Sequence, residues 1–257
     1  KMKERTLTAL GIIAVALFAM SFGNKGLLVL VFALILIAGY EIYDIRKDQY
    51  RPWMLAVIIP GILIGGLIDA SLFMVFLGIL MFVLFTISVS FEWFNFNEVS
   101  YSFIMIAMLV FALQSLKFTL SYGMLLFLYV LIANFATDTF AYFGGYFFGK
   151  RKLNKRISPK KTIEGSMIGY VMSAILSLTF AYFVLPSLNL PSLVYITASL
   201  TIPFVSQVGD LAFSLIKRHF DIKDFGKIFP GHGGVLDRID SVIFSLMCFN
   251  IILLVFA

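Results

Sequence analysis

The sequence has few charged residues, two histidines and one cysteine. Asp, Glu, Lys and Arg make up 13% of the 257 residues, whereas 61% are hydrophobic and 29 are Phe. With a mean hydropathy of +0.99, this composition excludes an ordinary water-soluble domain and indicates a polytopic membrane protein. A single cysteine excludes an intramolecular disulfide. Because His232 has no second histidine and no cysteine nearby in the sequence, we do not expect a zinc site, and we expect His219 to be an interfacial residue.

Long apolar runs alternate with short polar segments along the chain. A helix needs about 17 to 20 apolar residues to cross the hydrocarbon core, and the short alternating segments of a barrel are not visible. We predict an all-α, polytopic integral membrane bundle that forms a single domain over residues 1–257, with about nine transmembrane helices. The apolar runs are 6–22, 27–43, 53–69, 71–90, 101–116, 122–145, 166–185, 192–212 and 241–257.

Lys and Arg residues are distributed unevenly between the predicted loops. If the N-terminus is cytoplasmic, 18 of the 20 lie in cytoplasmic segments, as the positive-inside rule requires. Two polar loops, 146–165 and 213–240, then lie on the cytoplasmic side. The net charge of +6 is concentrated there, which favours partners that carry phosphate. We do not expect nucleic acid as a partner.

The N-terminal helices, residues 1–121, carry little recognisable chemistry. Their charged residues, among them Glu41, Glu92 and Glu98, fall mostly in predicted loops, where we expect them to be solvated. A position facing a cavity is the alternative for Glu92 and Glu98. We therefore place the catalytic half at residues 122–257.

Within the catalytic half, the character of the chain changes at the segment NFATDTFAYFGGYFFGKRKLNKRISPKKTIEGS, residues 134–166. Asp138 lies inside an apolar run, where a carboxylate is costly and therefore a functional candidate. Pairing with a lysine that joins two helices is the structural alternative. The spacing of Gly145 and Gly149 predicts the close approach of a neighbouring backbone. Ser158 and Pro159 are typical of a turn or a helix start, and the Lys and Thr side chains that follow suit a phosphate, although a basic cluster that only fixes topology is the alternative.

A polar stripe follows on the run 192–212 and beyond it. Gln207 and Asp210 are three residues apart and share a helix face, which Ser214 and Lys217 continue. The stripe leads into SLIKRHFDIKDFGKIFPGHGGVLDRID, residues 214–240, where glycines surround His232 and let the backbone approach a ligand. For His232 itself, a hydrogen bond within the loop and direct phosphate contact remain alternatives. Carboxylates among lysines and arginines suit a metal-bound polyphosphate better than a bare cation.

The segment 214–240 resembles the signature of the phosphatidate cytidylyltransferases, or CDP-diacylglycerol synthases. The pattern is S-x-x-K-R, four residues, K-D-x-G, and then P-x-H-G-G-x-x-D-R-x-D, and every fixed position is filled. The upstream segments DTFAYFGGYFFGK and SPKKTIEG also resemble that family. The resemblance covers roughly residues 134–240, whereas the N-terminal helices match only in spanning the membrane several times.

The resemblance implies an integral membrane enzyme, often dimeric, that makes CDP-diacylglycerol and pyrophosphate from CTP and phosphatidate. It implies Mg²⁺, with or without a second cation, and a bacterial inner or plasma membrane with the active site on the cytoplasmic side. The carboxylates that anchor the metal would be Asp210 and Asp237, and Lys217 and Arg218 would join them in catalysis. Further substrate contacts implied by position are Ser158, Lys160, Lys161, Thr162, Glu164, Ser214, Lys223, His232, Gly233, Gly234 and Arg238, with Asp138, Asp224 and Asp240 as additional candidates.

Elementary chemistry agrees with this reaction. The attacking lipid phosphate is already anionic, so it needs no general base, and the site must mainly neutralise charge. A CTP-dependent lipid or polyprenol kinase would need the same groups and is the nearest alternative. An ion-coupled transporter that uses Asp138 and Asp210 is the alternative from another class.

Overall fold

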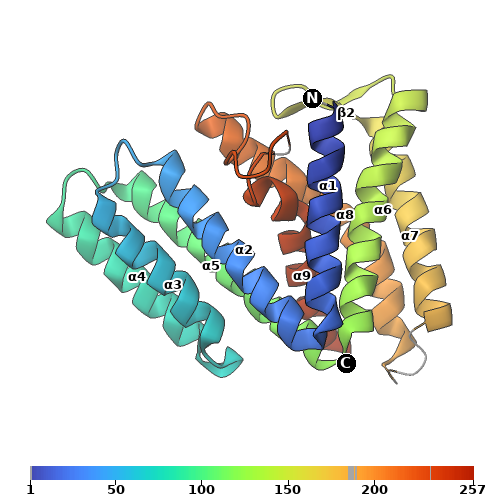
Figure 1. The fold of residues 1–257 in the computed structure, drawn as a ribbon, viewed down its shortest axis with the longest axis horizontal. Helices are drawn as coiled ribbons and strands as arrows, with labels where there is room; N and C mark the ends of the chain where they lie inside the picture. The colour runs from blue at the N-terminus through green and yellow to red at the C-terminus, as the bar shows by residue number, and fades with distance from the viewer. Residues whose placement is uncertain (1, 185–187, 189, 232) are drawn as a thin grey trace. The chain divides into compact units, whose positions relative to one another are not determined.

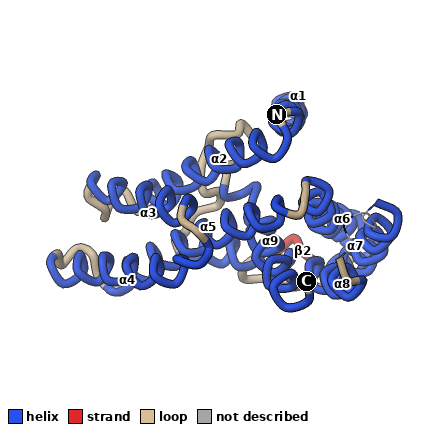
Figure 2. Tube along the Cα trace, turned by 90° about the horizontal axis from the view of Figure 1, so that it is seen from below, coloured by secondary structure: helices blue, strands red, loops and turns tan. Residues whose placement is uncertain are grey.

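The computed structural model describes residues 2–184, 188, 190–231 and 233–257, and it is almost entirely helical (Figures 1 and 2). The predicted all-α, polytopic fold is confirmed. The described residues form nine α-helices: α1 (Met2–Ser21), α2 (Gly23–Ile45), α3 (Leu55–Leu67), α4 (Phe73–Ser90), α5 (Phe96–Ser121), α6 (Met124–Phe148), α7 (Ile163–Val184), α8 (Ser192–His219) and α9 (Leu236–Phe256).

Seven helical segments of the described chain are long and apolar enough to cross a membrane, fewer than the nine predicted. The run 53–69 gives α3, a helix of 13 residues that follows a 3-10 turn at Pro52–Met54. At 1.5 Å per residue such a helix is shorter than the ~30 Å hydrocarbon core. The run 6–22 lies in α1, whose described apolar part is Leu10–Ser21.

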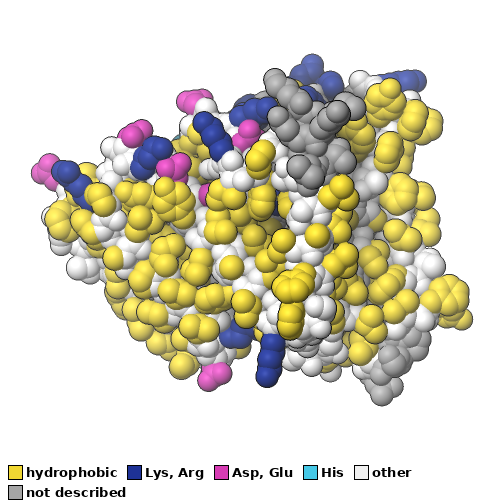
Figure 3. Space-filling view, in the orientation of Figure 1, with side chains coloured by type: hydrophobic (Ala, Val, Ile, Leu, Met, Phe, Trp, Pro, Cys, Tyr) yellow, Lys and Arg dark blue, Asp and Glu magenta, His cyan; other side chains and the backbone are white. Residues whose placement is uncertain are grey.

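The chain divides into two compact units. The first unit comprises Lys1–Gln114 and Asp224–Asp237, and the second unit comprises Ser115–Lys223 and Arg238–Ala257. Hydrophobic side chains cover most of the surface of both units that Figure 3 shows, and charged side chains lie mainly near helix ends. Phe82 and Tyr182, for example, are 71% and 75% exposed, as expected for helices that face lipid.

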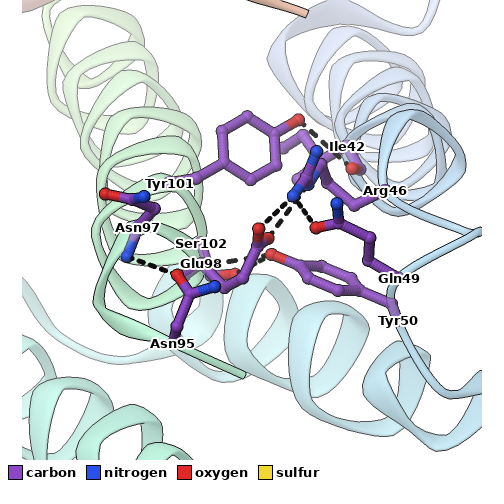
Figure 4. Close-up of polar contacts among 9 residues, drawn as sticks. All are labelled: Ile42, Arg46, Gln49, Tyr50, Asn95, Asn97, Glu98, Tyr101 and Ser102. Carbon is purple, nitrogen blue, oxygen red and sulfur yellow. Dashed lines mark hydrogen bonds and ion pairs between the residues drawn. The ribbon is translucent and has the colours of Figure 1, made fainter. Parts of the chain in front are cut away.

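In the first unit, polar contacts fix the ends of the helices. The Nε2 atom of Gln114 donates hydrogen bonds to the carbonyls of Gly65 (2.7 Å) and Ile68 (3.0 Å), which satisfies carbonyl groups at the C-terminus of α3. After α2, the Arg46 guanidinium binds the buried carboxylate of Glu98 on α5 (Figure 4). Tyr50 hydrogen-bonds to Ser102 beside this pair, with 2.8 Å between the hydroxyl oxygens.

These contacts correct one prediction. Glu98 is 3% exposed and paired with Arg46, and Glu41, near the end of α2, is 2% exposed. Neither carboxylate is solvated, because each has polar partners from a distant part of the chain within the first unit.

In the second unit, glycines allow α6 and α7 to pack closely along one another (Figure 1). A Cβ atom on Gly165 would lie 2.6 Å from the carbonyl oxygen of Ala141 and 2.8 Å from Gly145. A Cβ atom on Gly149 would lie 2.7 Å from Thr162 Cγ2. The predicted close approach of a neighbouring backbone is therefore confirmed at Gly145, whereas the neighbour of Gly149 is the Thr162 side chain.

The basic segment between α6 and α7 forms a two-stranded antiparallel hairpin, β1 (Lys152–Asn154) and β2 (Ser158–Thr162). The Asn154 side chain closes its turn by accepting the N–H groups of Arg156 (3.1 Å) and Ile157 (3.2 Å). The prediction of a turn or helix start at Ser158-Pro159 was wrong. Both residues lie in β2, where a strand at a sheet edge tolerates the missing N–H of proline. The helix begins at Ile163, with Thr162 Oγ1 accepting the N–H of Gly165 at 3.2 Å as an N-cap.

Candidate active site

A cavity of about 550 Å³ lies between α6, the hairpin, α7 and α8 in the second unit. This size suits a small molecule or a lipid headgroup. The wall combines two lysines and two carboxylates with hydroxyl, amide and aromatic groups. The lining residues are Asp138, Ala141, Tyr142, Gly145, Tyr146, Leu153, Lys160, Lys161, Thr162, Ser166, Gln207 and Asp210.

Lys161 on β2 forms an ion pair with Asp210 on α8. Both side chains are partly buried, with 30% and 25% of their surface exposed. Burial lowers the pKa of Lys161, although the negative charges of Asp138 and Asp240 oppose this shift. An anion that enters the cavity would therefore favour the charged form of the Lys161 amine.

Asp138 faces the same cavity from α6. Lys161 and Asp240 interact electrostatically with it. Asp138 therefore fits both sequence-based alternatives. It lines the cavity, as a functional carboxylate would, and its lysine partner, Lys161, lines the same cavity.

The polar stripe predicted on α8 faces the cavity through Gln207 and Asp210. The Gln207 side chain accepts a hydrogen bond from the Ser166 hydroxyl of α7. Its Nε2 atom donates to the carbonyls of Pro203 (3.2 Å) and Ser166 (3.3 Å). Gln207 is thus held in one orientation at the wall of the cavity.

Glu164 and Ser158 do not line the cavity. The Glu164 carboxylate accepts the N–H groups of Lys150 (3.0 Å) and Arg151 (3.1 Å), and Arg151 Nε donates to it at 3.0 Å. It therefore ties the start of the hairpin to the first turn of α7. Ser158 is half-buried at the start of β2.

The remaining predicted residues of the second unit lie on α8, just after it, and at the start of α9. Lys217 interacts electrostatically with Lys161, and Arg218 Nη1 donates to the carbonyl of Ile222 at 3.1 Å. Ser214 is half-buried, Lys223 and Arg238 are exposed, and Asp240 is buried.

The signature loop, residues 224–237, belongs to the first unit. Asp237 Oδ2 accepts the N–H groups of Phe225 (2.7 Å) and Gly234 (3.0 Å). Gly233 has a φ of +85° and pairs with Phe229, so a glycine is required by the backbone there. Asp224 is exposed at the start of the loop. His232 lies outside the described residues.

Sequence reasoning missed several residues that the fold brings to these sites. Tyr142 and Tyr146, four residues apart on α6, and Ser166 on α7 line the cavity. In the first unit, Glu41 accepts the N–H groups of Val235 (2.8 Å) and Leu236 (2.9 Å). The tyrosine spacing was a detectable signal, whereas nothing local connects Glu41 to the signature loop.

The carboxylates at the cavity are a donor set that suits a hard cation. Among the described residues, no group of three or more His, Cys, Asp and Glu side chains lies close enough together to hold a metal ion. Mg²⁺ usually takes one or two protein carboxylates and completes its shell with water and phosphate oxygens. Asp210 and Asp138 at a cavity lined by lysines fit that requirement.

Comparison with known proteins agrees with the signature. Residues 3–256 match the model of the cytidylyltransferase family. The chain is 34% identical to the phosphatidate cytidylyltransferase of Staphylococcus haemolyticus over 98% of this chain and 99% of that protein. It is 30% identical to the phosphatidate cytidylyltransferase of Bacillus subtilis over 100% and 99% of the two chains, and 36% identical to that of Staphylococcus saprophyticus over 98% and 99%. A match over nearly the whole length includes the N-terminal helices as well as the signature, so the chain belongs to the cytidylyltransferase family.

Proposed function

We propose that this enzyme transfers CMP from CTP to phosphatidate and releases pyrophosphate, with its active site on the cytoplasmic side of the membrane in which its helices lie. The observation that carries this proposal is the cavity of the second unit, which Lys160 and Lys161 line together with Asp138 and Asp210. Cations suited to phosphate thus lie beside carboxylates suited to a divalent metal. The relatives that match over nearly their full length are phosphatidate cytidylyltransferases, which supports phosphatidate and a cytidylyl donor as the two substrates.

The proposed reaction needs charge neutralisation more than proton transfer. The lipid phosphate attacks the α-phosphorus of CTP, an oxygen–phosphorus bond forms, and the bond to the pyrophosphate leaving group breaks. Lys160 and Lys161 would bind phosphate oxygens by charge-assisted hydrogen bonds, and Thr162 and Ser166 line the same cavity with hydroxyl groups. Such fixed groups stabilise the charge that develops in the transition state.

Mg²⁺, when bound, would supply further charge neutralisation of the CTP polyphosphate, and we propose Asp210 and Asp237 as its anchors. In the second unit, Asp138 is a further carboxylate at the same cavity as Asp210. The ion pair with Lys161 holds the Asp210 carboxylate beside the hairpin.

The apolar part of the cavity wall suits the lipid substrate. Tyr142 and Tyr146 line the cavity and are 69% and 74% exposed. On a membrane-spanning helix such side chains face lipid or the headgroup region. We propose that phosphatidate enters sideways past these tyrosines, with its phosphate directed to the lysines.

Transfer of a label tests the proposed reaction. Purified protein in detergent receives phosphatidate, Mg²⁺ and CTP labelled at the α-phosphate, and the label is followed into the lipid extract. We expect Mg²⁺-dependent transfer that ATP does not support. Label that leaves as CDP would instead indicate a CTP-dependent lipid kinase, and no consumption of CTP by folded protein would favour a transporter.

Asp210→Asn tests the carboxylate role within the same assay. We expect transfer to be abolished while the purified protein remains monodisperse, because the amide keeps the shape of the side chain but removes its charge. Asp48→Asn is the matched control, since Asp48 is exposed in the first unit and lies in the turn after α2. Near-normal transfer by Asp210→Asn would contradict the metal role.

The orientation and the assembly are part of the same proposal. The Lys and Arg distribution supports a cytoplasmic N-terminus, which accessibility of single introduced cysteines in sealed membranes would test. The resemblance of residues 134–240 supports a homodimer in a bacterial inner or plasma membrane, which cross-linking in native membranes would test.

A further inference from the structure

The carboxylate of Glu41 contacts the signature loop, although it lies in the part of the sequence with little recognisable chemistry. Its Oε1 atom accepts the N–H of Val235 at 2.8 Å, and its Oε2 atom accepts the N–H of Leu236 at 2.9 Å. Leu236 is the first residue of α9. Glu41 therefore satisfies backbone donors at the start of a helix that has Asp237 in its first turn.

The signature loop packs against the Glu41 carboxylate so closely that a side chain at Gly226 or Gly234 would collide with it. A Cβ atom on Gly226 would lie 2.4 Å from Glu41 Oε1, and a Cβ atom on Gly234 would lie 2.3 Å from the same oxygen. Glu41 is 2% exposed. Two glycines of the signature loop thus border the carboxylate, and a methyl group on either would displace it.

The bonds to Glu41 adjoin those to Asp237. Asp237 Oδ2 accepts the N–H groups of Phe225 and Gly234, and Glu41 accepts those of the next two residues, Val235 and Leu236. Three consecutive N–H groups thus bind two carboxylates. A shift of Glu41 would move the backbone at Val235 and Leu236, and with it the neighbouring Gly234 N–H that orients the Asp237 side chain.

We infer that Glu41 is a positioning residue that holds the signature loop and the start of α9, and through them Asp237, in the arrangement that cytidylyl transfer requires. The inference rests on the proposed role of Asp237. Both carboxylate oxygens act as acceptors, so the ionised side chain fits, whereas an amide would turn an NH₂ group toward a backbone N–H.

Glu41→Gln is the first variant, with Glu98→Gln as a matched control. Both are buried carboxylates of the first unit, at 2% and 3% exposure, but Glu98 pairs with Arg46 and not with the loop. We expect both variants to lower Tm. For Glu41→Gln, kcat should also fall by about 10- to 100-fold, as when a group that orients a metal ligand is removed. Glu98→Gln should keep the kcat of the wild-type protein per folded molecule.

Hydrogen exchange gives a readout that does not depend on activity. In Glu41→Gln, the amides of Val235 and Leu236 should exchange about 10-fold faster or more, because each loses a bond to a charged acceptor. Peptides near Arg46 and Glu98 should be unchanged in Glu41→Gln and faster in Glu98→Gln. Glu41→Asp, which keeps the charge but is one methylene shorter, should recover part of the lost kcat.

Gly226→Ala tests the same contact from the other side and remains informative if Glu41→Gln does not fold. Its methyl group should displace Glu41, so its effects on kcat and on exchange should match those of Glu41→Gln. The double variant should be no worse than either single variant, because both remove one interaction. Full additivity of the two would contradict the inference.

Two further results would overturn the inference. One is wild-type kcat in Glu41→Gln, and the other is an equal loss of kcat in Glu41→Gln and Glu98→Gln, which would reduce Glu41 to a general stabilising role. Asp237→Asn separates this inference from the proposed function. Unaltered transfer by Asp237→Asn contradicts the metal role of Asp237, whereas loss of transfer there with normal Glu41→Gln contradicts only the positioning role.

Discussion

Replacing Lys161 by Met should remove most of the transfer activity. The substitution keeps the length of the side chain but removes the ammonium that faces Asp138 and Asp210 in the cavity. A hydrogen bond to a charged group contributes about 1.5–3 kcal/mol, so kcat/KM should fall by about 10- to 100-fold. Lys155→Met is the matched control, since Lys155 is exposed in the turn of the same hairpin.

The same substitution also leaves Asp210 without its partner, and this effect has to be separated from catalysis. Breaking a fully buried pair costs about 3–5 kcal/mol. Because 30% and 25% of these side chains are exposed, solvent screens the charges and we expect about 1–2 kcal/mol. In the double variant Lys161→Met/Asp210→Asn, residue 210 no longer carries an unpaired charge, so Tm should return toward the wild-type value.

Transfer activity should remain lost in that double variant, because the reaction needs the charges of Lys161 and Asp210, whereas the folded state does not require them. Initial rates of label transfer at varied CTP and Tm in detergent measure the two effects on the same samples. A kcat/KM for Lys161→Met within about twofold of Lys155→Met, which is less than 0.5 kcal/mol, would refute the role of Lys161.

Two further predictions concern the pH profile and the packing of helices. Burial lowers the pKa of Lys161 below the usual value of 10.5, so the free enzyme loses its ammonium at a lower pH than an ordinary lysine. The alkaline fall of kcat/KM should therefore begin below that value, and Lys161→Arg should move it to higher pH, since a guanidinium stays protonated; an identical profile would contradict the assignment. Gly165→Ala should lower stability by about 1–3 kcal/mol, because its Cβ atom would lie 2.6 Å from the Ala141 carbonyl oxygen. Gly78→Ala is the control, because no atom outside its own stretch of helix backbone lies within 4 Å of its Cβ position, and equal Tm values for the two variants would contradict this packing.

The features that sequence analysis predicted well are those that depend on neighbouring residues. Apolar runs determine where helices form, because length and hydrophobicity are local properties. The face shared by Gln207 and Asp210 follows from helix periodicity, and both residues line the cavity. The ion pair of Asp210 with Lys161, 49 residues away, depends on the packing of α8 beside the hairpin and could not be read from spacing.

The hairpin was missed because two local rules conflict there. Proline after serine is common at a helix start, but it is also tolerated in an edge strand. The contacts of Glu164 with Lys150 and Arg151 hold the start of the hairpin at α7. Such contacts between segments more than ten residues apart favour the strand over a helix start, and no local sequence pattern predicts them.

The glycines of the signature loop also make contacts that the local sequence could not predict, and these contacts change how we interpret the glycines. From the sequence, they favour a backbone that approaches a ligand closely. Gly233 has a positive φ, but Gly226 and Gly234 border the Glu41 carboxylate, which lies 194 residues before Val235 in the chain. Glu41 and Asp237 together accept four backbone N–H groups of this loop and the start of α9. Buried donors without acceptors would be costly, so these two carboxylates stabilise the described backbone at Phe225 and at Gly234 to Leu236.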